Sequence, residues 1–170
     1  MTVDPILVPP ITDFLAGTTI IRLATVTPSG RPHLAPFWFW SDDERIVIST
    51  LANQTVRNLR VNPDCAVLVD LGEDFRDLRG AHIRGRAVIY DPSDPRPAPV
   101  ERALEEIDRV HAEELTEDEF VAYEAWETRD HIILEILPES ATWFDLGRHT
   151  MGRTGPGAER SIGPAAEIAR

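Results

Sequence analysis

The chain has 170 residues, of which 42% are hydrophobic, and a formal net charge of −12; it contains no lysine, so all 17 basic residues are arginine. These totals predict one globular domain with its own core, and the acidic balance argues against a general nucleic-acid-binding protein. No apolar run approaches the ~18 residues that a membrane span needs, and the N-terminus lacks the basic start and apolar stretch of a secretory signal. The single cysteine, Cys65, lies in an apolar segment and is expected to be a buried thiol. We therefore expect a cytoplasmic protein without a nucleic-acid or membrane partner.

The predicted elements begin with a short helix at Pro10–Gly17, which a glycine ends. Three β-rich strands follow, at Thr19–Val26, Pro32–Trp40 and Arg45–Thr50. The turns between them are short and contain the proline, glycine and aspartate residues that favour tight turns. Strands joined in this way predict an antiparallel meander.

The next segment, Ser49–Pro63 (STLANQTVRNLRVNP), predicts a helix of about two turns. Its end is set at Asn62–Pro63, because the residue before proline avoids helical angles. The strand predicted at Cys65–Leu71 is apolar on both faces, which indicates a central position. The longer strand at Leu78–Tyr90 alternates, with apolar residues on one face and His82, Arg84 and Arg86 on the other.

Beyond a proline-rich loop, an amphipathic helix is predicted from Val100 to His111, and a capping-box pattern at Thr116–Glu119 starts another. Two further strands are predicted at His131–Leu137 and Ala141–Leu146. Residues 148–170 lack periodicity and predict a flexible C-terminal tail, which leaves 1–147 as one domain. Six or seven antiparallel strands with peripheral helices indicate a mainly β (α+β) fold, a closed or split barrel rather than an open sheet.

Hydrogen-bond donors are concentrated where the strand Arg45–Thr50 passes into the short helix. The first turn of that helix leaves backbone N–H groups unpaired at the positive end of the helix dipole, an environment that suits a phosphate. The side chains that could contribute are Ser49, Thr50, Asn53, Gln54, Thr55 and Arg57. Alternatively, Asn53 or Thr55 only caps the helix and Arg57 lies in solvent. The residues alone leave both interpretations open.

Aromatic residues crowd the neighbouring strand at Pro36–Trp40, where they could all belong to the core or could line a pocket for a flat ring. The predicted phosphate site at the start of the helix, which we call the phosphate cradle, lies next to this strand in the sequence. A phosphate site beside aromatic side chains indicates a phosphate-bearing aromatic cofactor. Four arginines, at positions 76, 79, 84 and 86, form a local basic patch that would suit an anionic ligand, although single surface arginines more often make ion pairs. No histidine pair has metal-ligand spacing and no nucleophile or nucleotide-binding motif is present, so neither a metal site nor a catalytic residue is predicted.

Three segments, IIRLATVTPSGRPHLAPFWFW, IVISTLANQTVRNLRVNPDCAVLVD and LRGAHIRGRAVIYD, resemble the pyridoxamine 5′-phosphate oxidase-like split-barrel superfamily. Within it, they are most similar to the flavin and deazaflavin oxidoreductases, especially those that use coenzyme F420. The resemblance covers residues 11–146, and the helix pattern T-x-R-N-L-x-x-N-P is among its most specific parts. It implies a homodimer of six-stranded split barrels with cofactors in grooves at the interface.

The resemblance also implies roles for individual residues. Ser49 and Thr50 would approach the cofactor phosphate, and the cradle would be completed by Gln54, Thr55, Arg57 and Asn58. The ring would lie along Pro36, Phe37 and Trp38, while His33, Arg79 and Arg84 could polarise a substrate or hold an anionic tail. Many relatives carry lysine where Thr55 stands, and Arg57 could supply that charge.

The activity implied is hydride transfer from reduced coenzyme F420 to a small organic acceptor, with FMN as the alternative cofactor. A protein that binds a flavin, deazaflavin or haem without turnover is a second hypothesis. Pyridoxamine phosphate oxidation itself is a third, and it is disfavoured because the phosphate segment of that enzyme is richer in arginine and lysine.

Overall fold

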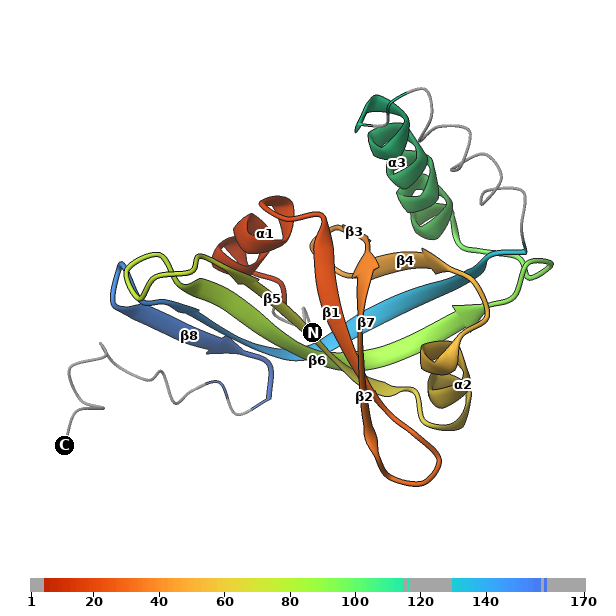
Figure 1. Ribbon diagram of the computed structural model, residues 1–170, viewed down its shortest axis with the longest axis horizontal. Helices are drawn as coiled ribbons and strands as arrows, with labels where there is room; N and C mark the ends of the chain where they lie inside the picture. The colour runs from red at the N-terminus through yellow and green to blue at the C-terminus, as the bar shows by residue number, and fades with distance from the viewer. Residues whose placement is uncertain (1–4, 115, 117–129, 157, 159–170) are drawn as a thin grey trace.

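Eight strands and three helices make up the described part of this computed structural model, which comprises residues 5–114, 116, 130–156 and 158 (Figure 1). In chain order they are α1 (Pro9–Ala16), β1 (Ile20–Val26), β2 (Pro32–Trp38), β3 (Trp40–Ser41), β4 (Ile46–Thr50), α2 (Gln54–Val61), β5 (Asp64–Leu71), β6 (Arg79–Tyr90), α3 (Ala98–Glu114), β7 (Ile132–Asp145) and β8 (Thr150–Thr154). None of the described helices has the length and apolar character needed to cross a membrane.

The strands form one antiparallel sheet that curls back on itself. Its order is β2-β1-β5-β6-β7-β4-β3, with β8 paired to β7. The two ends of this order, β2 and β3, are separated in sequence by Phe39 alone, so the chain itself joins one edge of the sheet to the other (Figure 1). This arrangement confirms the mainly β split barrel with peripheral helices.

The sequence and the structure differ at three places in the sheet. The two antiparallel pairings of the predicted meander are confirmed, but its middle strand is not continuous: the strand expected at Pro32–Trp40 breaks at Phe39, so that β2 pairs with β1 and β3 pairs with β4. The two strands predicted after residue 130 are one continuous strand, β7, in which a bulge accommodates Pro138 opposite Gly85. Finally, β8 lies inside the segment predicted as a tail.

Two predictions concern segments of which the structure describes little or nothing. The helix expected to start at Thr116 falls within residues 117–129, which lie outside the described part of the chain. Most of the predicted tail also lies outside it. The domain boundary at residue 147 therefore stays a prediction.

The main core fills the interior of the barrel. As predicted, β6 alternates, with Ala81, Ile83 and Ala87 buried inside and Arg84 and Arg86 exposed outside. The strand β5 lies between β1 and β6, which confirms its central position. Cys65 on β5 is buried, as expected, and burial raises the pKa of its thiol to about 12. The helices α1 and α2 each add apolar residues to this core.

A smaller apolar cluster lies between the sheet and α3. Val100 and Ala103 of α3 are buried with Val47 of β4 and Ile133 of β7. Alternate residues of β4, such as Ile46 and Ile48, belong instead to the barrel core. Both faces of β4 are therefore covered. This packing fixes the position and direction of the end of β4, where the chain continues into α2.

The outer face of β1 and β2 exposes several large apolar side chains around the ion pair of Arg22 with Asp70. The strand register places Ile20 beside Trp38 and Ala24 beside Leu34, on the face opposite the core. Leu34 is 61% exposed and Trp38 is 52% exposed, and Ile20 and Val26 are also exposed. We call the exposed residues Ile20, Val26, Leu34 and Trp38 the β1–β2 face.

Candidate functional site

The predicted donors gather where β4 ends and α2 begins, a region that we call the α2 corner (Ser49, Thr50 and residues 53–58). Asn53 is the N-cap of α2, because its Oδ1 accepts a hydrogen bond of 3.1 Å from the amide of Val56. Its Nδ2 donates to Thr50 Oγ1 at 2.9 Å. The capping role that the sequence left open for Asn53 is therefore confirmed, and the cap also ties the helix to β4.

Two backbone amides at the start of α2 remain without an acceptor. The amide of Val56 donates to the cap, and that of Arg57 donates to the carbonyl of Asn53 at 3.2 Å. The amides of Gln54 and Thr55 have no hydrogen-bond acceptor within the described residues. Because they lie at the positive end of the helix dipole, they can donate to an anion.

A chain of side-chain hydrogen bonds holds Arg57 at this end of the helix. Its guanidinium donates to Gln54 Oε1, at 2.9 Å from the terminal nitrogen. Gln54 Nε2 donates to Asn58 Oδ1 at 2.7 Å, and Asn58 Nδ2 donates to Thr25 Oγ1 of β1 at 2.9 Å. Asn58 is fully buried, so it anchors Gln54 and offers no atom to a ligand.

Arg57 and Arg60 differ in their surroundings. Arg57 is exposed and has no carboxylate partner among the residues that the structure describes. Arg60 forms an ion pair with Asp91, just beyond β6. Only Arg57 therefore keeps an unneutralised charge and spare donors beside the free amides.

Thr55 occupies the position at which many relatives carry lysine. Its side chain is buried, and its hydroxyl has no hydrogen-bond partner in the described part of the chain. Because that hydroxyl is enclosed, a ligand from solvent meets Thr55 only through its backbone amide. The corner thus combines two amides and one guanidinium, a donor set that fits a singly charged phosphate.

Ser49 contacts a residue that the sequence analysis did not select. Its Oγ lies 2.7 Å from Nδ1 of His131, the residue before β7. The pairing of β4 with β7, which sets Ser49 opposite Ile133, brings this histidine to the corner from 82 residues away. The only signal in the sequence was a polar residue at the head of an apolar strand.

The other predicted residues lie away from the corner in the same chain. The helix α2 meets β1 at Thr25, which pairs with His33, and Phe37 is about 13 Å farther along β2 at ~3.3 Å per residue. The segment after α2 contacts β6 at Ala87, so Arg79 is about 26 Å away along that strand by the same spacing. By the same spacing, Trp38 is about 17 Å from the residue opposite Thr25, whereas Pro36 is about 10 Å from it and Arg84 is about 10 Å from Ala87.

A cavity of about 630 Å³ opens elsewhere, between α1, the segment 38–43 and α3. This volume suits a small organic molecule. Its walls include the apolar side chains of Leu15, Phe39 and Ile107. Trp38 also lines it, so the end of the strand predicted to carry the cofactor ring borders this cavity.

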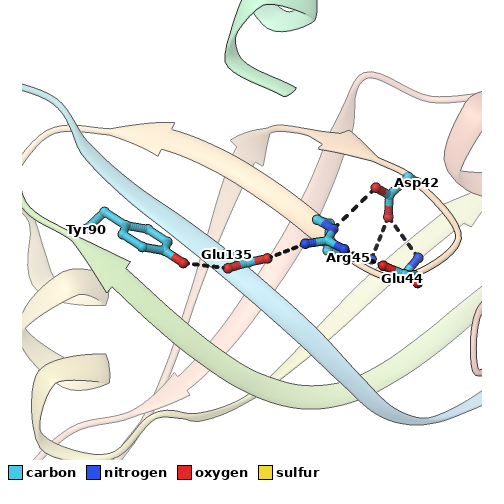
Figure 2. Close-up of polar contacts among 5 residues, drawn as sticks. All are labelled: Asp42, Glu44, Arg45, Tyr90 and Glu135. Carbon is cyan, nitrogen blue, oxygen red and sulfur yellow. Dashed lines mark hydrogen bonds and ion pairs between the residues drawn. The ribbon is translucent and has the colours of Figure 1, made fainter. Parts of the chain in front are cut away.

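The densest polar cluster is a structural brace rather than a binding site. Arg45 donates to Glu135 Oε1 at 2.9 Å and to Asp42 Oδ2 at 3.2 Å, and it also pairs with Glu44 (Figure 2). Tyr90 Oη donates to the other oxygen of Glu135 at 2.7 Å (Figure 2). Burial and then this hydrogen bond raise the pKa of Tyr90 to about 12. Since both oxygens of the buried carboxylate are used, the cluster joins β4, β6 and β7 and leaves Glu135 unavailable to a substrate.

Comparisons with known proteins agree with the fold. Conserved hypothetical protein Rv2991 from Mycobacterium tuberculosis is 26% identical, with a TM-score of 0.63; the match covers 79% of this chain and 81% of that one. A haem-binding protein from Mycobacterium smegmatis is 17% identical (TM-score 0.62, covering 84% of this chain and 55% of that one). An FAD-binding protein from Mesorhizobium loti is 20% identical (TM-score 0.54, 78% and 87%).

No curated protein matches the sequence significantly. The sequence model of the family described as pyridoxamine 5′-phosphate oxidase matches residues 7–133, which span the sheet from α1 to the start of β7 and include the whole α2 corner. The chain therefore belongs to the pyridoxamine 5′-phosphate oxidase family.

Proposed function

We propose that the protein is an oxidoreductase that transfers a hydride from reduced coenzyme F420 to a small organic acceptor. The observation that carries this proposal is the α2 corner, where two amides with no acceptor among the described residues lie beside the guanidinium of Arg57, which has no carboxylate partner among them. A helix N-terminus with an adjacent arginine is a favourable site for a phosphate group. Family membership supports a cofactor of the flavin type.

The charge of the corner favours F420 over FMN. The first phosphate of F420 is a diester with one negative charge, whereas the monoester of FMN carries about 1.5 to 2 charges at pH 7. With Thr55 in place of lysine, Arg57 is the one cationic side chain in the corner as defined above. One guanidinium and a helix N-terminus can neutralise the single charge of the F420 diester, but they leave part of the larger charge of the FMN monoester uncompensated.

The chain's own residues hold and orient the cofactor rather than carry out bond chemistry. Bound F420 would supply the hydride, and the protein would supply position and a dry surrounding. Gln54 fixes Arg57, and Asn58 fixes Gln54 to β1. Phe37 and Trp38 would flank the ring, and the cavity that Trp38 borders offers room for the acceptor.

A homodimer is part of this proposal. The β1–β2 face exposes four large apolar side chains that a second copy would cover. Arg79 lies about 26 Å along β6 from the segment after α2 within one chain, which favours a site to which two chains contribute. The cytoplasmic location expected from the sequence stays a prediction.

Two alternatives remain within the same family. An FMN-dependent oxidoreductase would use the same corner. A binding protein without turnover is favoured by the neutral Thr55 and by similar folds described as haem-binding and FAD-binding proteins. Absorbance spectra of the purified protein after separate incubation with F420, FMN and haem distinguish the ligands, and reduction of added acceptors distinguishes turnover from binding.

Titration of F420 and FMN at low and high ionic strength tests the cofactor assignment. We expect F420 to bind more tightly by about one or two decades at low salt, because its extra carboxylates can contact exposed arginines. Salt should reduce this preference, since exposed charges are screened. Equal affinities at low salt, or a preference that salt does not change, would move the assignment to FMN.

A further inference from the structure

A second, smaller cavity lies on the outer face of the sheet, where β6, β7 and β8 run side by side. Its volume is about 220 Å³, and its lining includes His82, Arg84, Ser140, Thr142 and Arg153. Strand pairing explains how these residues meet. His82 is opposite Thr142, which is opposite Arg153, and one step along the sheet Arg84 is opposite Ser140.

Among the described residues, the two arginines of this cavity have no carboxylate partners, whereas other arginines on the same face do. Arg86 pairs with Asp64 at 3.2 Å, and Arg22 pairs with Asp70. Arg84 instead has Ala66 and Ser140 as its cross-strand neighbours and makes no ion pair with any described residue.

Arg153 is similarly uncompensated. Among the described residues, its guanidinium makes one hydrogen bond, a long one of 3.4 Å to the carbonyl of Pro156. No carboxylate lines the cavity in the described part of the chain. Burial and then the charge of Arg84 lower the pKa of His82, so the field of Arg84 reaches into the cavity. In a chain with a net charge of −12, this spot is locally cationic.

The wall of the cavity depends on a close backbone approach. Gly155 has φ 92°, and a Cβ at this position would lie 2.6 Å from the carbonyl oxygen of Glu139 and 2.8 Å from Cα of Ser140. Glycine therefore lets the chain leave β8 close against β7. This approach keeps the end of β8, with Arg153 opposite Thr142, close to Ser140.

We propose that this cavity binds an oxyanion, a carboxylate or phosphate group, between the guanidinium groups of Arg84 and Arg153. The planar guanidinium of arginine can donate two parallel hydrogen bonds to a carboxylate or to a phosphate. The hydroxyls of Ser140 and Thr142 add further donors. The volume is below the roughly 300–1,000 Å³ of sites for whole small molecules. The cavity therefore takes an anionic end group or a free phosphate rather than a ring system.

This site is separate from the α2 corner and does not depend on the cofactor assigned there. Two sources could provide the oxyanion, namely the carboxylate tail of F420 and an independent small anion. Both share the chemistry that the cavity recognises, so binding is measured first with simple anions.

The test is a titration of the full-length, cofactor-free protein with inorganic phosphate and then with glutarate, followed by NMR of the arginine Nε–H groups. We expect the signals of Arg84 and Arg153 to move together and saturate. Arg84→Gln and Arg153→Gln should each weaken binding about tenfold through the loss of charge-assisted hydrogen bonds. Arg148→Gln is the control, because Arg148 is exposed and pairs with Asp145 at the β7–β8 turn; it should change affinity less than twofold.

Thermal melts of each variant check that the fold is retained. The proposal is overturned if neither anion produces a saturable shift, or if the Arg84→Gln/Arg153→Gln double variant binds as the wild type does. It is also overturned if the double variant converts a dimer to a monomer while the wild type binds no anion, because the face would then serve a second copy.

The same variants identify the source of the oxyanion. If Arg153→Gln weakens F420 binding as well as phosphate binding, the cavity receives the cofactor tail. If only phosphate binding falls, it receives a separate anion. Either result supports the oxyanion site, whereas a wild type that binds phosphate but not F420 contradicts only the proposed function.

Discussion

Arg57 and Arg60 lie three positions apart on α2, yet their contacts assign them different roles. Arg57 is held by Gln54 beside two amides that have no acceptor in the described part of the chain, while Arg60 is neutralised by Asp91. We expect Arg57→Ala to weaken cofactor binding about 10- to 100-fold, because a charge-assisted hydrogen bond contributes roughly 1.5–3 kcal/mol. Arg60→Ala should change the affinity by less than about twofold. Equal affinities of the two variants, measured by titration, would show that the phosphate lies elsewhere.

Tyr90 provides a pH-dependent contribution to stability. Its pKa is raised to about 12 in the folded protein, above the ordinary value near 10, so folding favours the neutral phenol. The stabilisation is fully present below pH 10 and is lost as the pH rises from 10 to about 12. Tyr90→Phe should lower the free energy of unfolding by about 1.5 kcal/mol at pH 8 through loss of the bond to Glu135.

The difference in unfolding free energy between wild type and Tyr90→Phe should shrink toward pH 12. Urea unfolding of both proteins from pH 8 to pH 12 measures it. The comparison removes the contribution of Cys65, which both proteins share. A difference that stays constant with pH would contradict the assigned hydrogen bond.

Residue-level predictions from the sequence were correct where chemistry is local. The segment after β4 was predicted to present donors at a helix N-terminus, and the structure places them there. The sequence could not show that Asn58 is buried against Thr25 or that Thr55 points its hydroxyl inward. Those facts depend on how α2 packs on β1, and the contact of Ser49 with His131 depends on pairing across most of the chain.

At the scale of elements, the bulge between β6 and β7 leaves no room for a side chain at Gly85. A Cβ on Gly85 would lie 2.3 Å from the carbonyl oxygen of Leu137, which is backbone and cannot rotate away. Gly85→Ala should therefore lower the free energy of unfolding by about 3 kcal/mol. Gly30→Ala is a useful comparison, because Gly30 has φ 81° but open space around it.

Because only backbone strain acts at this position, Gly30→Ala should lower the free energy of unfolding by about 1 kcal/mol. Urea denaturation of both variants separates the effect of a clash from that of strain. A smaller loss for Gly85→Ala than for Gly30→Ala would mean that β7 shifts easily at its bulge.

Helices and single strands were predicted well because their signals are local. The alternation along β6, the two-turn α2 and the stop at Pro63 all depend on neighbouring residues. The break at Phe39 and the continuity of β7 through Pro138 depend on sheet closure and on a bulge. No local pattern reports these, which is why the middle strand of the predicted meander was expected to be continuous.

At the scale of the whole molecule, the β1–β2 face determines whether the proposed dimer forms. Leu34 is the most exposed residue of this face. We expect Leu34→Glu to raise the dimer dissociation constant at least about 100-fold, since burying an unpaired carboxylate costs several kcal/mol. Phe75→Glu is the control, because Phe75 is 68% exposed but lies outside the face.

Sedimentation at micromolar concentration measures the effect. The wild type and Phe75→Glu should sediment as dimers and Leu34→Glu as a monomer. A monomeric wild type would remove the proposed interface, and equal dimerisation of all three proteins would place it on another surface.

The order of strands in the sheet also bears on how the protein is made. Apart from the two-residue β3, the strand β4 has no partner in the described sheet until Ile132–Ile136 of β7 arrives, more than 80 residues later. Pairing across such separations is slow to form, and a growing chain folds from its N-terminal side. The α2 corner therefore reaches its final geometry only after residues 132–136 have been made and have paired with β4. A nascent chain released before residue 131 would lack both the histidine beside Ser49 and the strand that holds β4, so a complete α2 corner reports that the barrel has closed.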